Sequence, residues 1–151
     1  MSVRSATVED ALAVETVRIR GWQAAYRGIV PDSFLDSLVI DTQRRARLMG
    51  SADVTTLVAG DDEVVGMAVY GPARDDDGVV ELYALYVDPS AWRTGVGAAL
   101  LAACEGVTVL WVLADNERAQ AFYKRYGFAV DGASRVLDLD GPVTEIRMRR
   151  G

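Results

Sequence analysis

Residues 79–104 form the part of the sequence that most restricts what the chain can fold into. They read as a long apolar strand ending at Asp88-Pro89, then a turn with glycines at positions 95 and 97, then a short apolar helix. Glycines at a helix start let a ligand approach the backbone and leave amide groups free to donate. This order predicts an α/β fold with an anion-binding turn before the helix, although glycines there are also ordinary turn residues.

The pattern on either side of this unit predicts one α/β domain over residues 1–151, a length that suffices for one core. Gly21 is expected to interrupt a first helix that starts after Thr7, with a turn over residues 22–30. The other predicted helices span residues 31–38, 41–49, 98–104 and 116–125. The predicted strands span residues 3–6, 54–59, 64–70, 79–87, 107–113, 128–130, 136–139 and 143–148.

Composition excludes several kinds of chemistry. The chain has no histidine and one cysteine, which removes Ser-His-Asp triads, Cys-His dyads, disulfides and thiolate metal clusters, so no metal is expected. A net charge of −6 argues against nucleic acid as a partner and suits a cationic substrate, although solubility alone explains it. No apolar run is long enough to span a bilayer and no secretion signal is visible, so we expect a cytoplasmic protein without a membrane partner.

Two longer motifs identify a family. The turn is neither a dinucleotide-binding fingerprint, because the third glycine is missing, nor a P-loop. The run Glu81-Leu82-Tyr83-Ala84-Leu85-Tyr86-Val87-Asp88-Pro89, followed by Arg93-Thr94-Gly95-Val96-Gly97, resembles the acetyl-CoA motif of the GNAT superfamily of N-acetyltransferases. Residues 110–128, with Asn116, Tyr123 and Gly127-Phe128 in register, resemble its second motif, and residues 4–38 are also similar to members. The resemblance implies a mixed, mostly antiparallel sheet flanked by helices.

The resemblance also implies where acetyl-CoA binds. The backbone of residues 85–87 is expected to pair with the pantetheine arm, and the turn with the pyrophosphate. The family often has Arg or Gln where this chain has Trp92, so the pyrophosphate is expected to depend more on backbone amides. Asn116 either holds the cofactor arm or only caps a helix. The expected cofactor-binding residues are Leu85, Tyr86, Val87, Trp92, Arg93, Thr94, Gly95, Val96, Gly97, Ala98 and Asn116.

Two residues match positions with catalytic roles in the family. Glu81 is the candidate general base, with an exposed strand-end glutamate as the alternative. Tyr123 is the candidate acid that protonates the departing thiolate, with a packed tyrosine as the alternative. Strand alternation predicts that Glu81, Tyr83 and Leu85 share one face.

The implied reaction is acetyl transfer from acetyl-CoA directly to a primary amine of a small molecule such as a polyamine, amino acid or drug. Trp22, Tyr26 and Tyr83 are candidates for the acceptor pocket, although they also suit plain packing, and Trp111 is expected in the core. Cys104 is expected to pack rather than react. A protein or peptide N-terminal acetyltransferase and a non-catalytic acyl-CoA sensor are the alternatives, and a homodimer is possible.

Overall fold

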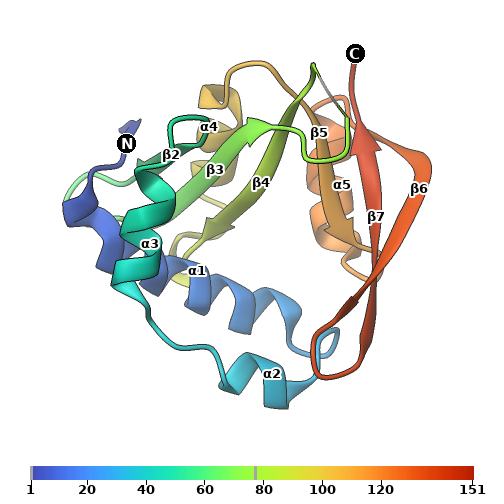
Figure 1. Cartoon of the computed structure of the whole chain (residues 1–151), viewed down its shortest axis with the longest axis horizontal. Coiled ribbons are helices and arrows are strands. Elements are labelled where there is room, and N and C mark those ends of the chain that lie inside the picture. Colours follow the sequence, from blue (N-terminus) through green and yellow to red (C-terminus); the bar gives the residue numbers. More distant parts are fainter. Residues whose placement is uncertain (1, 77) are drawn as a thin grey trace.

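The computed structural model describes residues 2–76 and 78–151 as a seven-stranded sheet with helices on both faces (Figure 1). The strands are β1 (Val3–Ser5), β2 (Thr55–Ala59), β3 (Gly66–Pro72), β4 (Val80–Val87), β5 (Val107–Leu113), β6 (Ala129–Asp138) and β7 (Pro142–Arg149). The helices are α1 (Ala11–Tyr26), α2 (Asp32–Asp36), α3 (Thr42–Met49), α4 (Val96–Ala103) and α5 (Glu117–Arg125), with short 3-10 turns η1 (Val8–Asp10) and η2 (Pro89–Ala91). None of the helices in the described part is long and apolar enough to cross a bilayer.

The sheet is mixed and mostly antiparallel, as predicted. Its strands follow the order β1-β2-β3-β4-β5-β7-β6. Each neighbouring pair is antiparallel except β4 with β5. Parallel neighbours need a crossover, which α4 supplies behind the sheet in Figure 1, while α1 and α2 lie in front of it.

Strands β4 and β5 separate along their length. Their paired residues end with Leu82 opposite Leu110. Strand β4 continues to Val87 and β5 to Leu113 without pairing to each other. The last part of β4 therefore has a strand partner, β3, on one side only.

A β-bulge marks the point where the separation begins. Val69 of β3 opposes Ala84, whereas Tyr70 opposes Leu82, so Tyr83 is an extra residue in β4. A bulge bends its strand and increases the local twist. The bulge therefore turns the end of β4 away from β5.

The bulge also overturns one prediction about side-chain direction. Alternation was expected to place Glu81, Tyr83 and Leu85 on one face. Instead, Leu85 packs with Leu82 against the α4 cluster behind the sheet, and Tyr83 packs with the α1 cluster in front. The extra residue shifts the alternation by one position.

Helix α1 runs unbroken through Gly21, which corrects the prediction that this glycine ends it. Gly21 is buried, and a Cβ built there would lie 3.0 Å from the Cβ of Tyr86. The glycine therefore serves close packing of α1 on β4, and that packing outweighs its cost of about 1 kcal/mol in a helix. The turn predicted for residues 22–30 is limited to residues 27–30, because α1 extends to Tyr26.

The strands predicted at residues 128–130 and 136–139 are the two ends of a single strand, β6. The pairing of β6 with β7 is interrupted between Val130 and Ser134, where Gly132 has a φ of +94°. In the sequence this irregular stretch resembles a turn, and β6 was therefore predicted as two separate strands. The other predicted boundaries shift by one or two residues, because hydrogen bonding at element ends depends on neighbours.

Packing fixes α4 against the sheet. A Cβ built at Gly66 of β3 would lie 2.7 Å from Val96 Cγ1 and 2.9 Å from Leu100 Cδ1, so the glycine lets α4 sit directly on β3. Leu100 and Leu101 are buried in the same cluster as Leu82. The start of α4 is therefore held at a fixed place beside the end of β4.

A buried ion pair fastens α1 to α3. The Glu15 carboxylate accepts hydrogen bonds from Arg18 at 2.9 Å, Arg45 at 3.0 Å and the Asp41 amide at 3.1 Å. Burial alone would raise the pKa of Glu15, but these donors lower it to about 2. The chain around α2 and α3 is thereby anchored on α1, which forms one wall of the site below.

Candidate active site

A cavity of about 740 Å³ lies at the separation of β4 and β5. Residues 82–87 of β4 and residues 110–113 of β5 line it in the middle. Helix α1 lines it in front of the sheet, and α4 and α5 line it behind. A ligand in this cavity can therefore reach from one face of the sheet to the other.

The turn before α4 presents backbone amides to the rear part of the cavity. Arg93 and Gly95 have φ angles of +64° and +89°, and the Thr94 hydroxyl donates to the Ala91 carbonyl at 2.5 Å. The first hydrogen bond of this helix end runs from the Ala99 amide to the Gly95 carbonyl, at 3.0 Å. The amides before it have no acceptor within the helix, and the helix dipole adds positive potential there. The turn therefore suits an anionic group.

Trp92 is fixed in place and supports a second basic residue. Its indole N–H donates to the Val87 carbonyl at 2.8 Å. The Arg118 guanidinium lies 4.0 Å from the centre of the Trp92 ring, which favours a cation–π contact. Arg118 therefore places a positive charge beside the turn, although Trp92 itself carries none.

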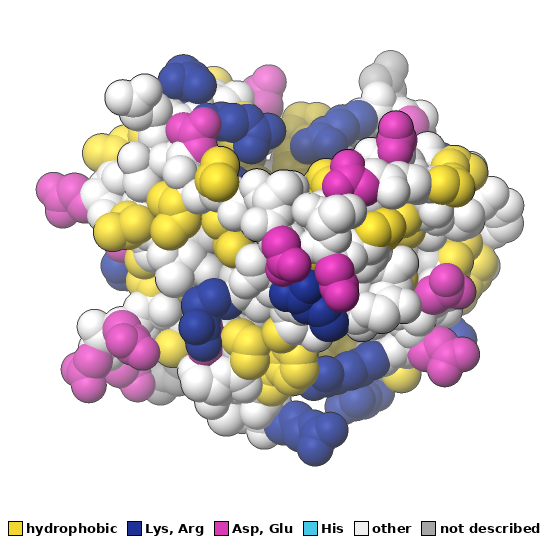
Figure 2. All heavy atoms as spheres, turned by 90° about the horizontal axis from the view of Figure 1, so that it is seen from below, with side chains coloured by type: hydrophobic (Ala, Val, Ile, Leu, Met, Phe, Trp, Pro, Cys, Tyr) yellow, Lys and Arg dark blue, Asp and Glu magenta, His cyan; other side chains and the backbone are white. Residues whose placement is uncertain are grey.

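The rear part of the cavity is basic within an acidic protein. Arg93, Arg118 and Arg125 line it, whereas the whole chain has a net charge of −6. Figure 2 shows Lys and Arg side chains beside hydrophobic side chains at the lower edge of the underside, and further ones near its upper edge. Such a local concentration of positive charge attracts phosphate groups.

Tyr123 lines the cavity from α5, and its ring contacts Phe122 and Phe128. Burial raises the pKa of the Tyr123 phenol well above its ordinary value. The hydroxyl is therefore protonated at neutral pH and can donate a hydrogen bond. Asn116 caps the same helix, accepting from the Ala119 amide at 3.2 Å, and also lines the cavity.

Glu81 is buried rather than exposed, with 4% of its surface accessible. Its carboxylate accepts from the Arg74 amide at 3.4 Å. Burial raises the pKa of Glu81, an effect that this hydrogen bond and the Arg74 charge partly offset. Glu81 is not among the residues that line the cavity wall.

Aromatic side chains line the front part of the cavity. Trp22 packs edge-on against Tyr26 with ring centres 4.9 Å apart, and the hydroxyls of Tyr26 and Tyr86 lie 3.5 Å apart. Tyr83 also lines the cavity, with the Arg74 guanidinium 4.3 Å from its ring centre and its hydroxyl donating to the Pro72 carbonyl. This part of the wall suits an apolar or cationic group.

Trp111 corrects the prediction that it packs in the core. The residue is only half-buried and lines the cavity, and the Arg135 guanidinium lies 4.1 Å from its ring centre. Trp111 shares the front face with Leu113, because alternate residues of β5 point the same way.

The structure brings together all but two of the predicted site residues. Thr94 and Glu81 do not line the cavity. Sequence reasoning missed many other lining residues, among them Trp111, Arg118, Arg125, Leu137, Leu139 and Glu145. Arg118 lies in the second motif and could have been found there. Glu145 has no local signal, since only the pairing of β7 with β5 places it opposite Leu113.

Comparisons with known proteins agree with this geometry. The sequence model of the acetyltransferase (GNAT) family matches residues 19–128. The uncharacterised N-acetyltransferase YuaI of Bacillus subtilis (strain 168) is 32% identical over 146 residues, covering 83% of this chain and 79% of the relative.

Two solved structures share the fold. The PaiA N-acetyltransferase of Thermoplasma acidophilum in complex with coenzyme A superposes with a TM-score of 0.77 at 21% identity, over 100% of both chains. The ribosomal-protein-alanine N-acetyltransferase of Brucella melitensis gives a TM-score of 0.76 at 25% identity, over 99% of both chains.

The chain belongs to the acetyltransferase (GNAT) family. It is an N-acetyltransferase, an acyltransferase that depends on acetyl-CoA.

Proposed function

We propose that residues 1–151 form one catalytic domain that transfers the acetyl group of acetyl-CoA directly to a primary amine of a small molecule. The observation that carries this proposal is the polarity of the cavity. Its rear part is lined by arginines and backbone amides, its middle by the end of β4, which lacks a strand partner on the β5 side, and its front by aromatic rings. A long phosphorylated donor fits the first two parts and an amine fits the third.

The residues present fit coenzyme A. The end of β4 has no strand partner on the side of β5, so the amide groups of a pantetheine arm can pair with residues 85–87 as an added strand would. The left-handed turn at Gly95 presents amides to the pyrophosphate, with Arg93 and Arg118 beside it. Bound there, acetyl-CoA supplies an activated thioester at the middle of the cavity.

Gly95→Ala is expected to weaken coenzyme A binding by about tenfold or more, measured by titration calorimetry. Gly95 has a φ of +89° with no other atom within 4 Å of a built Cβ, so alanine there adds backbone strain, about 1–2 kcal/mol, without a clash. The strain is expected to turn the amides away from the pyrophosphate.

Gly132→Ala is the matched control. Gly132 has a φ of +94°, equally open surroundings and a place on β6 away from the cavity. We expect it to lose similar stability and to bind coenzyme A as the wild type does. If coenzyme A binding were weakened equally in both variants, backbone strain in general, and not the turn at Gly95, would account for the lost affinity.

Two residues are assigned to proton transfer. A C–N bond forms between the amine nitrogen and the acetyl carbon as the C–S bond breaks. The ammonium passes one proton to Glu81, directly or through water, and Glu81 later releases it to solvent. The leaving sulfur receives the phenolic proton of Tyr123, and the resulting phenolate takes the second proton that the nitrogen loses as the amide forms. Deprotonating an alkyl ammonium at pH 7 costs about 4–5 kcal/mol, so a general base helps the reaction. Burial raises the pKa of Tyr123, so the phenol stays protonated at neutral pH and can donate a hydrogen bond to the developing thiolate. Full proton transfer from this phenol to a thiolate is uphill, so its help to the reaction is modest.

Direct transfer is supported by the state of Cys104, the only cysteine. Its side chain is buried behind the sheet, and burial raises the pKa of its thiol to about 11. A buried neutral thiol is a poor nucleophile. An acyl-cysteine route is therefore not part of the proposal.

Tyr123→Phe is expected to lower kcat by about tenfold to a hundredfold while coenzyme A affinity holds, because the hydrogen-bond donor to the leaving sulfur is lost. Steady-state thiol release measures the first and calorimetry the second. Tyr70→Phe, which removes a hydroxyl from a half-buried tyrosine of β3 outside the cavity wall, is the control. Unchanged kcat in Tyr123→Phe would remove this residue from the chemistry.

Glu81→Gln is expected to lower kcat by about a hundredfold and to abolish the acidic limb of the pH profile. A base works only when deprotonated, so activity rises with pH through the pKa of Glu81, which burial holds above the ordinary 4.5. Glu105→Gln changes an exposed glutamate and is the control. Survival of the acidic limb in Glu81→Gln would exclude Glu81 as the base, and would agree with its position outside the cavity wall.

A peptide N-terminus is the second candidate acceptor, favoured by the fold neighbour that acetylates ribosomal-protein alanine. We expect free primary amines to stimulate thiol release from acetyl-CoA at least tenfold more than alanyl peptides do at equal concentration. Faster release with the peptides would reverse the assignment. Tight coenzyme A binding without stimulation by either class would indicate a binding module instead.

A further inference from the structure

Glu145 is the one carboxylate among the described residues that line the cavity. It lies on β7 opposite Leu113 of β5, in front of the sheet. The arginines of the cavity wall, by contrast, come from α5 and from the turn before α4. The cavity therefore has a positive part and, separate from it, a single negative group.

The Glu145 carboxylate is accessible from the cavity but not free in solvent. Its side chain is 15% exposed, and it accepts from Arg135 Nε at 2.8 Å. Arg135 reaches it from β6 and is itself 41% exposed. The ion pair with Arg135 leaves other lone pairs of the Glu145 carboxylate available to a second cation.

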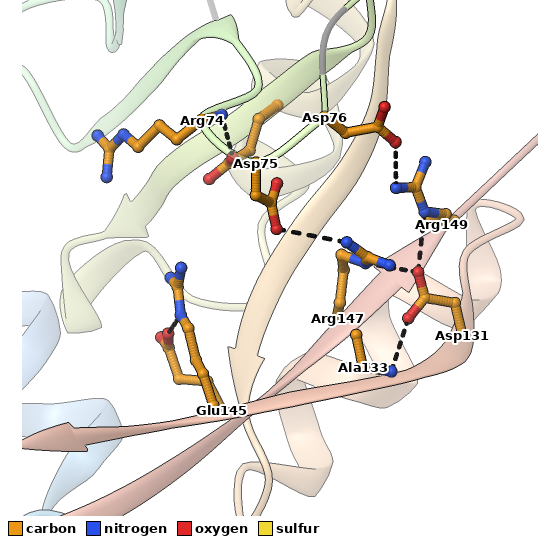
Figure 3. A network of polar contacts seen from close by, with 10 residues as sticks. Arg74, Asp75, Asp76, Asp131, Ala133, Glu145, Arg147 and Arg149 are labelled. Atoms are coloured by element: carbon orange, nitrogen blue, oxygen red, sulfur yellow. Dashed lines mark hydrogen bonds and ion pairs between the residues drawn. The ribbon is translucent and has the colours of Figure 1, made fainter.

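The neighbouring arginines do not compete for Glu145. Arg147 and Arg149 both bind Asp131, at 2.6 Å and 2.8 Å, and they also bind Asp75 and Asp76 of the loop before β4. Figure 3 shows this network on one side of β7, with the Glu145 carboxylate pointing away from it.

The surroundings of Glu145 are aromatic and aliphatic. Burial is the main cause that raises the pKa of Tyr26 and Tyr86, and the Glu145 charge adds to it, so both phenols are neutral. Both tyrosines line the same cavity as Glu145. Trp22 packs on both rings, with centres 4.9 Å and 6.2 Å away. The aliphatic part of the wall comes from Leu113, Leu137 and Leu139.

We propose that Glu145 binds the cationic amino group of the acceptor, and that the acceptor is a monoamine with an aromatic or branched aliphatic body. This inference rests on the proposed function, since it names the amine that the site accepts. One ammonium can pair with Glu145 and lie against the rings of Trp22 and Tyr26, while the body of the molecule packs on the leucines.

The same wall disfavours polyamines. A second ammonium of the same molecule would meet leucine side chains or the Arg135 guanidinium, because Glu145 is the one carboxylate that the described residues contribute to the cavity wall. Placing an unpaired charge against apolar groups is costly. The acidic surface of the chain as a whole does not change this, because it does not line the cavity.

Glu145 binds the ammonium directly in this account and orients it before Glu81 takes its proton, so removal of Glu145 should act on KM more than on kcat. We expect Glu145→Gln to raise the KM for phenethylamine by about tenfold to a hundredfold, the range for a hydrogen bond to a charged group. The kcat should change less than threefold, and coenzyme A affinity should be unchanged. Spermidine should be a poor substrate of the wild type.

Arg135→Gln is the matched control, because it breaks the same ion pair from the other side and keeps the carboxylate. We expect it to leave the KM for phenethylamine unchanged or to lower it. Equal rises of KM in both variants would show that the ion pair only supports the wall, and would overturn the proposal. A wild type that prefers spermidine, or a peptide beginning with alanine, would overturn the assigned class of acceptor.

Calorimetry with coenzyme A separates this inference from the proposed function. If coenzyme A binds but the enzyme prefers a different class of amine from the one proposed, only the role of Glu145 is contradicted. Absence of coenzyme A binding in the wild type would contradict the function on which it rests.

Discussion

Strand β4 is hydrogen-bonded to β5 only as far as Leu82, and the rest of the site depends on that separation. In a continuous sheet the backbone amide and carbonyl groups at the end of β4 would be hydrogen-bonded to a neighbouring strand on both sides. The extra residue Tyr83 bends the strand away and leaves those groups free. It also opens a route between the two faces, so that a donor bound behind the sheet and an acceptor bound in front can meet.

Close packing at two glycines holds this opening in shape. Gly21 brings α1 against Tyr86, and Gly66 brings α4 against β3. Any larger side chain at either position would push a wall of the cavity outward. Charge then divides the opening, with Arg93 and Arg118 on the donor side and Glu145 on the acceptor side. Shape therefore sets where the two substrates meet, and charge sets which substrate enters from which side.

Local sequence signals predicted much of the fold and of the candidate site. They failed at positions whose structure depends on contacts with distant segments of the chain. The turn at Gly95, the cap at Asn116 and the short helix between them follow from motifs that carry their own chemistry. The prediction that Gly21 interrupts α1 was wrong because the glycine is needed for close contact with Tyr86, which lies 65 positions away in the sequence. Glu145 was missed because only strand pairing brings β7 beside β5. The bulge at Tyr83 has no signature in a single sequence, since an extra residue is visible only against its partner strand.

Hydrogen exchange at the end of β4 tests the central claim most directly. With coenzyme A bound, the amides of residues 83–87 that face β5 rather than β3 should exchange markedly more slowly, because the pantetheine arm completes the hydrogen bonding that β5 leaves open. The amides of β1, at the far edge of the sheet, should exchange at the same rate with and without the ligand. Saturating coenzyme A that leaves exchange in residues 83–87 unchanged would show that the donor does not bind along this strand, and would contradict the account.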